Sequence, residues 1–264
     1  MDVRVNAGAP LHPVEVDLLC VFAEVEAPFP LEVPAFGHSD VEQREMFRSA
    51  REHLTDRGLA DANGPLGVAE DFVFLLRSCT GVLDMVLAKE ELTLGAAVLV
   101  HRDEALLVTQ DLASEDKMIR MKPATLDEAL DDLVRLVPRA ETPLTAPFSL
   151  PRRALEEAFE ALVSRGESLV GQEVDEVLRS QGIDDRVTRR MVSHLQPVVG
   201  NGQVGVARRD ETEDQWTRIG DELRWLDTER GRYRLAGDAE WMSVNPLPRD
   251  EVRAEIRKLA LKTR

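Results

Sequence analysis

The sequence predicts an α+β protein with pseudo-twofold duplicated halves, in which a central, mostly antiparallel β-sheet is flanked by helices and helical bundles. Each half contains helices, a strand, a hairpin, a second strand, a proline turn and a final helix. The ends of the halves also align, residues 118–136 with residues 241–259. The identical positions are Pro123 and Pro246, Asp127 and Asp250, Glu128 and Glu251, and Leu136 and Leu259. Both strand sets could join one sheet, or each could form its own.

The expected division of the chain follows this repeat. We expect an N-terminal half over 1–138, a linker over 139–148 that is rich in proline, and a C-terminal half over 149–264. Hydrophobic residues make up 43% of the chain, enough for a sizeable core. The simplest arrangement is one compact domain over 1–264.

The first half opens with a short strand at Pro13–Val16, and Asp17 is expected to cap the helix that follows. Ser39 and Glu42 form a capping box that starts a second helix, which ends at Arg57-Gly58. This helix should turn four apolar residues toward the core: Val41, Met46, Ala50 and Leu54.

A third helix over Val68–Ser78 should bury Phe72, Leu75 and Leu76. The period then changes to that of β-structure. The expected strands are Val82–Lys89, Gly95–His101, Ala105–Asp111 and Lys117–Lys122. Thr125 and Glu128 then cap a helix that ends at Pro138.

The second half repeats this order. Three helices are expected, from Ser149 and Pro151 to about Gly166, from about Ser168 to Gln181, and from about Asp184 to Leu195. The expected strands are Val204–Arg208, Leu223–Leu226, Arg232–Leu235 and Trp241–Val244. Pro248 and Asp250 then start a last helix, which runs to Leu261.

The charge excludes several functions. The net charge is −16, which argues against binding to nucleic acid or to an anionic membrane. Residues 1–138 carry 12 basic and 26 acidic side chains, so nearly all the excess acid lies in the first half. This asymmetry favours either simple solubility or a first half that faces a basic partner. We expect no signal peptide and no transmembrane helix, and a cytoplasmic location.

The sequence motifs that could indicate a cofactor, metal or catalytic site are weak evidence for one. Gly200-Asn201-Gly202-Gln203-Val204-Gly205 matches G-x-G-x-x-G, but a helix precedes it and a strand follows, the reverse of a dinucleotide site. The histidines show no metal-ligand spacing: His12, His38, His53, His101 and His194. Cys20 and Cys79 are too few for a disulfide framework, and Cys20 should be buried and inert.

The remaining polar groups are also best read as surface features. The acidic pairs Glu90-Glu91 and Asp131-Asp132 are typical of solvated faces, as is the basic cluster of Arg186, Arg189 and Arg190. No catalytic set is visible, so we expect no enzyme, no cofactor and no metal. Two carboxylates with strongly raised pKa values in one cleft would revive an enzyme with an acidic site.

Three stretches together resemble the EspG family of type VII (ESX) secretion chaperones, over nearly the whole chain. The first is Phe29-Pro30-Leu31 with Gly37, Glu42-Gln43-Arg44 and Leu54-x-x-Arg57-Gly58-Leu59. The second is Ser149-Leu150-Pro151-Arg152-Arg153-Ala154-Leu155-Glu156-Glu157-Ala158. The third is Trp225-Leu226-Asp227-Thr228-x-x-Gly231-Arg232-Tyr233, followed by Trp241, Val244 and Pro246. The preference for Arg over Lys fits an actinobacterial source, where this family occurs.

The resemblance implies a cytoplasmic, non-enzymatic chaperone. It would bind a PE–PPE heterodimer through the PPE subunit, cover the apolar tip of that subunit and keep it soluble for export. The free protein could form a homodimer. The alternative is a related binding module for a different helical secretion substrate, or an assembly factor of the same system.

The resemblance also implies where the partner binds. In the family, the loop between the second and third strands and the helical bundle of the second half contact the substrate tip. Here these regions correspond to Lys89, Glu90, Glu91, Leu92, Thr93 and Leu94, and to Gln181, Ile183 and Arg186 within about 168–195. Arg232 and Tyr233 are expected to be structural, with Arg232 anchoring a carboxylate and Tyr233 packed in the core.

Overall fold

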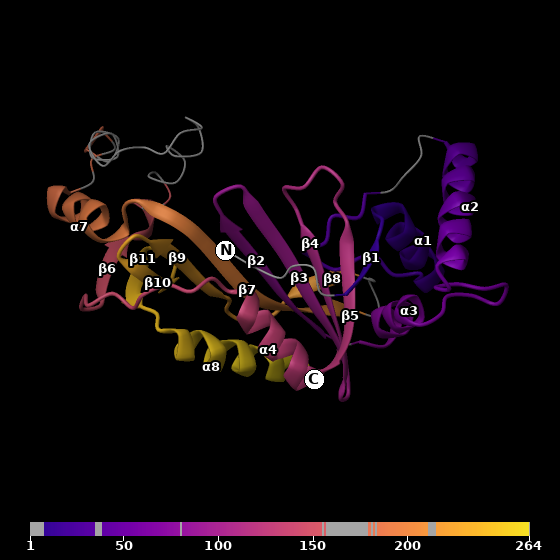
Figure 1. The fold of residues 1–264 in the computed structure, drawn as a ribbon. Helices are drawn as coiled ribbons and strands as arrows, with labels where there is room; N and C mark the ends of the chain where they lie inside the picture. The colour runs from indigo at the N-terminus through magenta and orange to yellow at the C-terminus, as the bar shows by residue number, and fades with distance from the viewer. Residues whose placement is uncertain are drawn as a thin grey trace. The chain divides into compact units, whose positions relative to one another are not determined.

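The computed structural model describes residues 8–34, 39–79, 81–154, 156, 179–180, 182, 184–210 and 215–263. Residue contacts divide the chain into two compact units that are not continuous in sequence. The first unit comprises Met1–Pro138, Val204–Glu222 and Glu255–Arg264. The second comprises Arg139–Gln203 and Leu223–Ala254. Figure 1 shows the elements of both.

The strands of the first unit follow the hydrogen-bonded order β1-β5-β4-β3-β2-β7, and β8 pairs with β7. Their bounds are β1 Ala9–Leu11, β2 Gly81–Lys89, β3 Leu92–His101, β4 Glu104–Asp111, β5 Ile119–Thr125, β7 Val198–Asp210 and β8 Gln215–Arg218. The predicted strand at Val204–Arg208 is thus the central part of the longer β7, and β8 was not predicted. Residues of β7 up to Gln203 belong to the second unit.

The prediction of a strand at Pro13–Val16 is wrong. The first strand is β1, and helix α1 (Pro13–Ala23) begins directly after it. His12 caps this helix, because its Nδ1 accepts a hydrogen bond from the backbone N–H of Val14 and Glu15 bonds back to the His12 N–H. Pro13 fits the first helical position, where no intrahelical donor is needed.

The other helices of the first unit begin and end close to the predicted residues. They are α2 (Asp40–Asp56), α3 (Val68–Ser78), α4 (Leu126–Leu136), the end of α8 (Arg249–Ala260) and the short helix η1 (Leu261–Thr263). Ser39 and Thr125 cap α2 and α4 as predicted. The predicted core face of α2 is partly wrong, because Ala50 and Leu54 are buried but Val41 is 61% exposed. No helix in the described ranges is long and apolar enough to cross a membrane.

Both faces of the first unit's sheet are buried. Helix α1 contacts α2 and α3, and α3 packs on β3, β4 and β5. Alternate strand residues such as Leu99 and Leu106 join this core. Their neighbours Val98 and Leu107 point to the opposite face and are also buried, and α4 packs on the same strands. Because both faces are buried, the sequences of β2, β3 and β4 are almost continuous runs of apolar residues.

The strands of the second unit follow the order β7-β9-β10-β11-β6. Their bounds are β6 Phe148–Pro151, β9 Leu223–Thr228, β10 Gly231–Gly237 and β11 Trp241–Pro246. Ser149–Pro151 was predicted to open a helix but forms β6, which pairs with β11. Helix α7 (Asp185–Leu195) is capped by Asp184, near its predicted start. The predicted helix from about 168 to 181 lies almost wholly outside the described residues.

The two halves of the sequence repeat the same connectivity, as predicted. In the first half, β2, β3, β4 and β5 form a meander that is followed by α4. In the second half, β7, β9, β10 and β11 form a meander that is followed by α8. The aligned prolines occupy matching register positions, since Pro123 pairs with Leu106 and Pro246 pairs with Tyr233. The strands β1 and β6 also match, because each pairs with the last strand of its meander. Since β7 is common to both orders, the strands form one antiparallel sheet.

Candidate partner-binding surfaces

The first predicted surface is the β2–β3 hairpin of the first unit. The predicted loop of Lys89 to Leu94 is much shorter in the structure, because Lys89 pairs with Leu92 and only Glu90 and Glu91 form the turn. Glu90 adopts a left-handed conformation with a φ of 54°, which lets the chain reverse this tightly. Thr93 and Leu94 continue β3, and Leu94 is fully buried. Leu94 is therefore part of the core and not of the exposed hairpin end.

The exposed hairpin end combines charge with one apolar side chain. Glu90 and Glu91 are exposed, and Lys89, Leu92 and Thr93 are half-buried. The adjoining β4–β5 loop lies alongside, because the Leu112 N–H donates to the Thr93 carbonyl oxygen over 2.6 Å. This end of the sheet presents carboxylates around Leu92, an arrangement that suits protein contact.

The second predicted surface lies in the second unit and is only partly described. Gln181 and Ile183 lie outside the described residues. Arg186 lies in the first turn of α7, exposed, and its backbone N–H donates to Asp184 Oδ1 over 2.8 Å. Arg189 and Arg190 are also exposed on this helix. The structure thus gathers the hairpin residues at one sheet end, and it places Arg186 on a basic helix of the other unit.

The glycine motif is a packing feature of β7. Gly200, Gly202 and Gly205 all lie within this strand, and no helix follows them directly. A Cβ on Gly202 would lie 2.1 Å from Cζ2 of Trp225, so only glycine leaves room for the buried indole. A dinucleotide needs the N-terminus of a helix for its phosphates, and β7 offers none.

The other candidate chemical groups have structural surroundings. Cys20 and Cys79 are both buried, as predicted for Cys20, and burial raises the pKa of their thiols to about 12, which disfavours the reactive thiolate. Asp131 pairs with Arg257 at 3.3 Å, and Asp132 with both Lys122 and Arg135. Within the described ranges, no group of three His, Cys, Asp or Glu side chains could hold a metal ion.

One carboxylate, that of Asp84, is almost fully buried and belongs to an ion-pair network. Asp84 on β2 is 1% exposed and bonds Arg218, which also pairs with Glu222 at 2.9 Å. Burial raises the pKa of Asp84, an effect that the Arg218 guanidinium opposes. The arrangement is an ion-pair network with one buried acid, which differs from the two-carboxylate cleft that an acidic enzyme site needs.

The Gly-Arg-Tyr hairpin is structural, as the sequence predicted. The Arg232 guanidinium bonds both carboxylate oxygens of Asp227, at 2.6 and 2.8 Å, and both residues are buried. The same guanidinium stacks on the ring of Trp225, 5.3 Å from its centroid. Tyr233 is fully buried, and its hydroxyl lies 3.3 Å from Thr145 Oγ1.

Comparison with known proteins gives this geometry a context. A chain of the solved structure of the Mycobacterium tuberculosis type VII secretion system chaperone EspG5 in complex with the PE25-PPE41 dimer is similar in fold. The similarity covers 97% of this chain and 96% of that chain, with 12% sequence identity and a TM-score of 0.63. No curated protein sequence matches. The EspG family matches residues 12–258, which is most of the sequence, and the chain therefore belongs to the EspG family.

Proposed function

We propose that this protein is a cytoplasmic chaperone of type VII secretion, which binds PE–PPE heterodimers through the apolar tip of the PPE subunit. Membership of the EspG family carries this proposal. The fold supports it, because it is similar to that of a structure in which EspG5 is in complex with a PE–PPE dimer. Covering an exposed apolar tip prevents aggregation before export.

We infer that the β2–β3 hairpin, together with Gln181, Ile183 and Arg186, contacts the client. Leu92 is the apolar anchor of the hairpin, because it is half-buried between the exposed turn and the core. A partner that covers it removes apolar surface from water. The acidic turn around it and the arginines of α7 would give the contact its charge selectivity.

The test is calorimetric titration of the protein with a purified PE–PPE heterodimer from the same organism. We expect a 1:1:1 complex. Leu92→Asp and Ile183→Asp should each weaken binding about 30-fold or more, since truncating or charging a central apolar contact costs about 2 kcal/mol or more. Glu91→Arg should weaken binding by a smaller factor. This substitution lies in the exposed turn and leaves the core intact.

Val41→Asp is the matched control, because Val41 is an exposed apolar residue of α2 that belongs to neither proposed surface. It should bind like the unaltered protein. Intact binding by both the Leu92 and the Ile183 variants would show that the client binds elsewhere. Failure of every PE–PPE pair, with capture of another helical export substrate, would favour the related binding module instead.

A further inference from the structure

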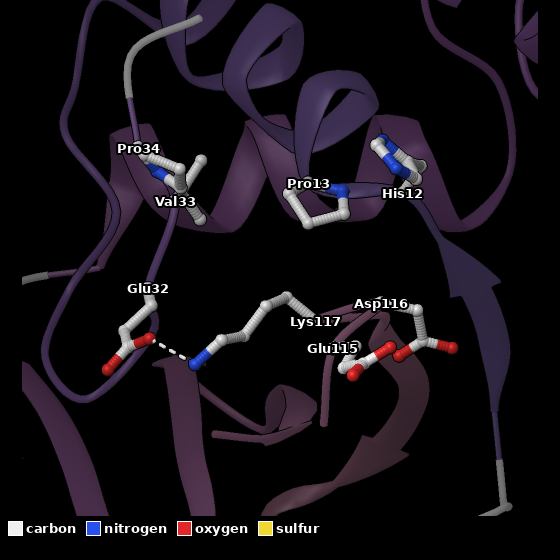
Figure 2. A pocket seen from close by; sticks show the side chains of 8 residues that line it. All are labelled: His12, Pro13, Glu32, Val33, Pro34, Glu115, Asp116 and Lys117. Carbon is white, nitrogen blue, oxygen red and sulfur yellow. Dashed lines mark hydrogen bonds and ion pairs between the residues drawn. The ribbon is translucent and has the colours of Figure 1, made fainter. Parts of the chain in front are cut away.

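A pocket of about 610 Å³ lies in the first unit, beside the β4–β5 loop. This volume is within the range of small-ligand pockets, roughly 300–1,000 Å³. Figure 2 shows two unlike walls: His12, Pro13, Val33 and Pro34 face Glu32, Lys117, Glu115 and Asp116. One wall is mainly apolar and the other is charged. Such a pocket fits a group that has an apolar stem and a polar head.

The backbone of the charged wall is held by one buried amide. Gln110 is 1% exposed, and its Nε2 donates to the carbonyl oxygens of Glu32 and Lys117, over 3.0 and 2.9 Å. Its Oε1 accepts from the Glu32 N–H over 2.8 Å. These three bonds join the Glu32 and Lys117 segments, which are far apart in sequence, so the charged wall is held in place before any ligand arrives.

The charged wall carries net negative charge. Lys117 Nζ pairs with Glu32 Oε2 at 2.7 Å, as the dashed line in Figure 2 shows. The other carboxylates of the lining are Glu115 and Asp116, and no ion pair between described residues of the lining reaches them, although Arg120 and His12 lie close enough to lower the pKa of Asp116. Both carboxylates are exposed to solvent.

The Asp116 carboxylate is oriented by its own loop. Its Oδ1 accepts hydrogen bonds from Ser114 Oγ over 2.7 Å and from the Met118 N–H over 3.2 Å. These bonds hold the pKa of Asp116 below its usual value, so the group is ionised at neutral pH. Among the described residues, no hydrogen bond reaches its Oδ2, which remains available to a donor from outside.

We propose that this pocket binds a cationic side chain, arginine or lysine, presented by a partner protein. The aliphatic stem would pack on Pro13, Val33 and Pro34, and the head would pair with Asp116 and Glu115. The −14 net charge of residues 1–138 would steer such a partner toward this unit. The proposal does not depend on whether the partner is a PE–PPE client.

The test uses N-acetyl-arginine methylamide and N-acetyl-lysine methylamide as probes, titrated into the ¹⁵N-labelled protein and followed by NMR. We expect saturable shifts of the amides of Ser114 to Met118 and of Glu32, with a dissociation constant on the order of 1 mM for at least one probe. The stronger probe identifies the preferred head group. N-acetyl-leucine methylamide should cause no saturable shift.

Glu115→Lys should weaken binding of the cationic probe at least tenfold. Because Glu115 is exposed, this substitution should leave the fold intact. Asp103→Lys is the matched control, because Asp103 is exposed in the β3–β4 turn and the charge change is identical. It should keep the dissociation constant within about twofold. The proposal is overturned if neither cationic probe gives saturable shifts, or if both variants weaken binding equally. Calorimetry with PE–PPE tests the proposed function separately, so the two can fail independently.

Discussion

The β3–β4 hairpin of the first unit and the β9–β10 hairpin of the second have the same backbone plan and different interiors. In the first, Val100 pairs with Ala105 next to the turn, and both are buried. At the same place in the second, Asp227 pairs with Arg232 and forms a buried ion pair. The difference shows that the repeat preserves register while the side chains inside it change in chemistry.

The buried ion pair of the second hairpin depends on specific neighbouring side chains, whereas the aliphatic pair of the first hairpin does not. The Arg232 guanidinium needs both oxygens of Asp227 and the face of Trp225. Trp225 in turn needs the space that Gly202 leaves open. Each member of this set depends on the next, so replacing any one should affect the others.

Removing one ion-pair partner should have the largest effect. Asp227→Ala leaves a buried guanidinium without its carboxylate, which costs about 3–5 kcal/mol. The double variant Asp227→Val with Arg232→Met imitates the apolar pair of the first unit and should recover much of that loss. Urea unfolding followed by circular dichroism measures both. If the double variant were as unstable as the single one, the two hairpins would not be interchangeable.

Gly202→Ala should have the next largest effect. A Cβ there would lie 2.1 Å from the Trp225 ring, so the indole must move out of its packed position. Overpacking of this kind costs about 1–3 kcal/mol. In a Trp225→Val background the same substitution should cost almost nothing, because the collision is gone. Equal costs in both backgrounds, in a double-mutant cycle, would place the strain elsewhere.

The smallest effect should come from the turn of the β2–β3 hairpin. Glu90 has a φ of 54°, a conformation that costs a residue with a side chain about 1 kcal/mol. Glu90→Gly removes that strain but raises the conformational entropy of the unfolded chain, so the net stabilisation should stay below about 1 kcal/mol.

Gly231→Ala in the second unit should have the opposite sign and destabilise the protein, because its Cβ would lie 2.3 Å from the Glu141 carbonyl oxygen. A rise in stability there would contradict this account.

Much of the fold could be predicted because its signals are local. The Ser39 cap of α2, the capping box of α4 and the proline turn before α8 each occupy a few consecutive residues. The first strand could not be read this way, because β1 is only three residues long and Pro13–Val16 has strand-like composition. The repeat contained a usable signal, since Ser149-Leu150-Pro151 and Leu11-His12-Pro13 each join an edge strand to a helix.

The candidate surfaces were less predictable. The alternation of Leu92, Thr93 and Leu94 indicates a strand, and the resemblance led us to treat the same residues as a loop. The pocket of Figure 2 was missed entirely, because its walls come from three segments that are far apart in sequence, and only two of them, at Glu32 and Lys117, are joined by the hydrogen bonds of Gln110. Only the acidic bias of residues 1–138 hinted at a site for a basic partner.

The interleaved order of the two units has a consequence for synthesis on the ribosome. The first unit needs Val204–Glu222 and Glu255–Arg264 in addition to Met1–Pro138. Gly81, at the start of β2, packs so closely on Thr263 that a Cβ would lie 2.8 Å from its Cα. A nascent chain therefore cannot complete its first unit before Thr263 has left the exit tunnel, and until then β2 lacks its contact with Thr263 even though β7 has already emerged.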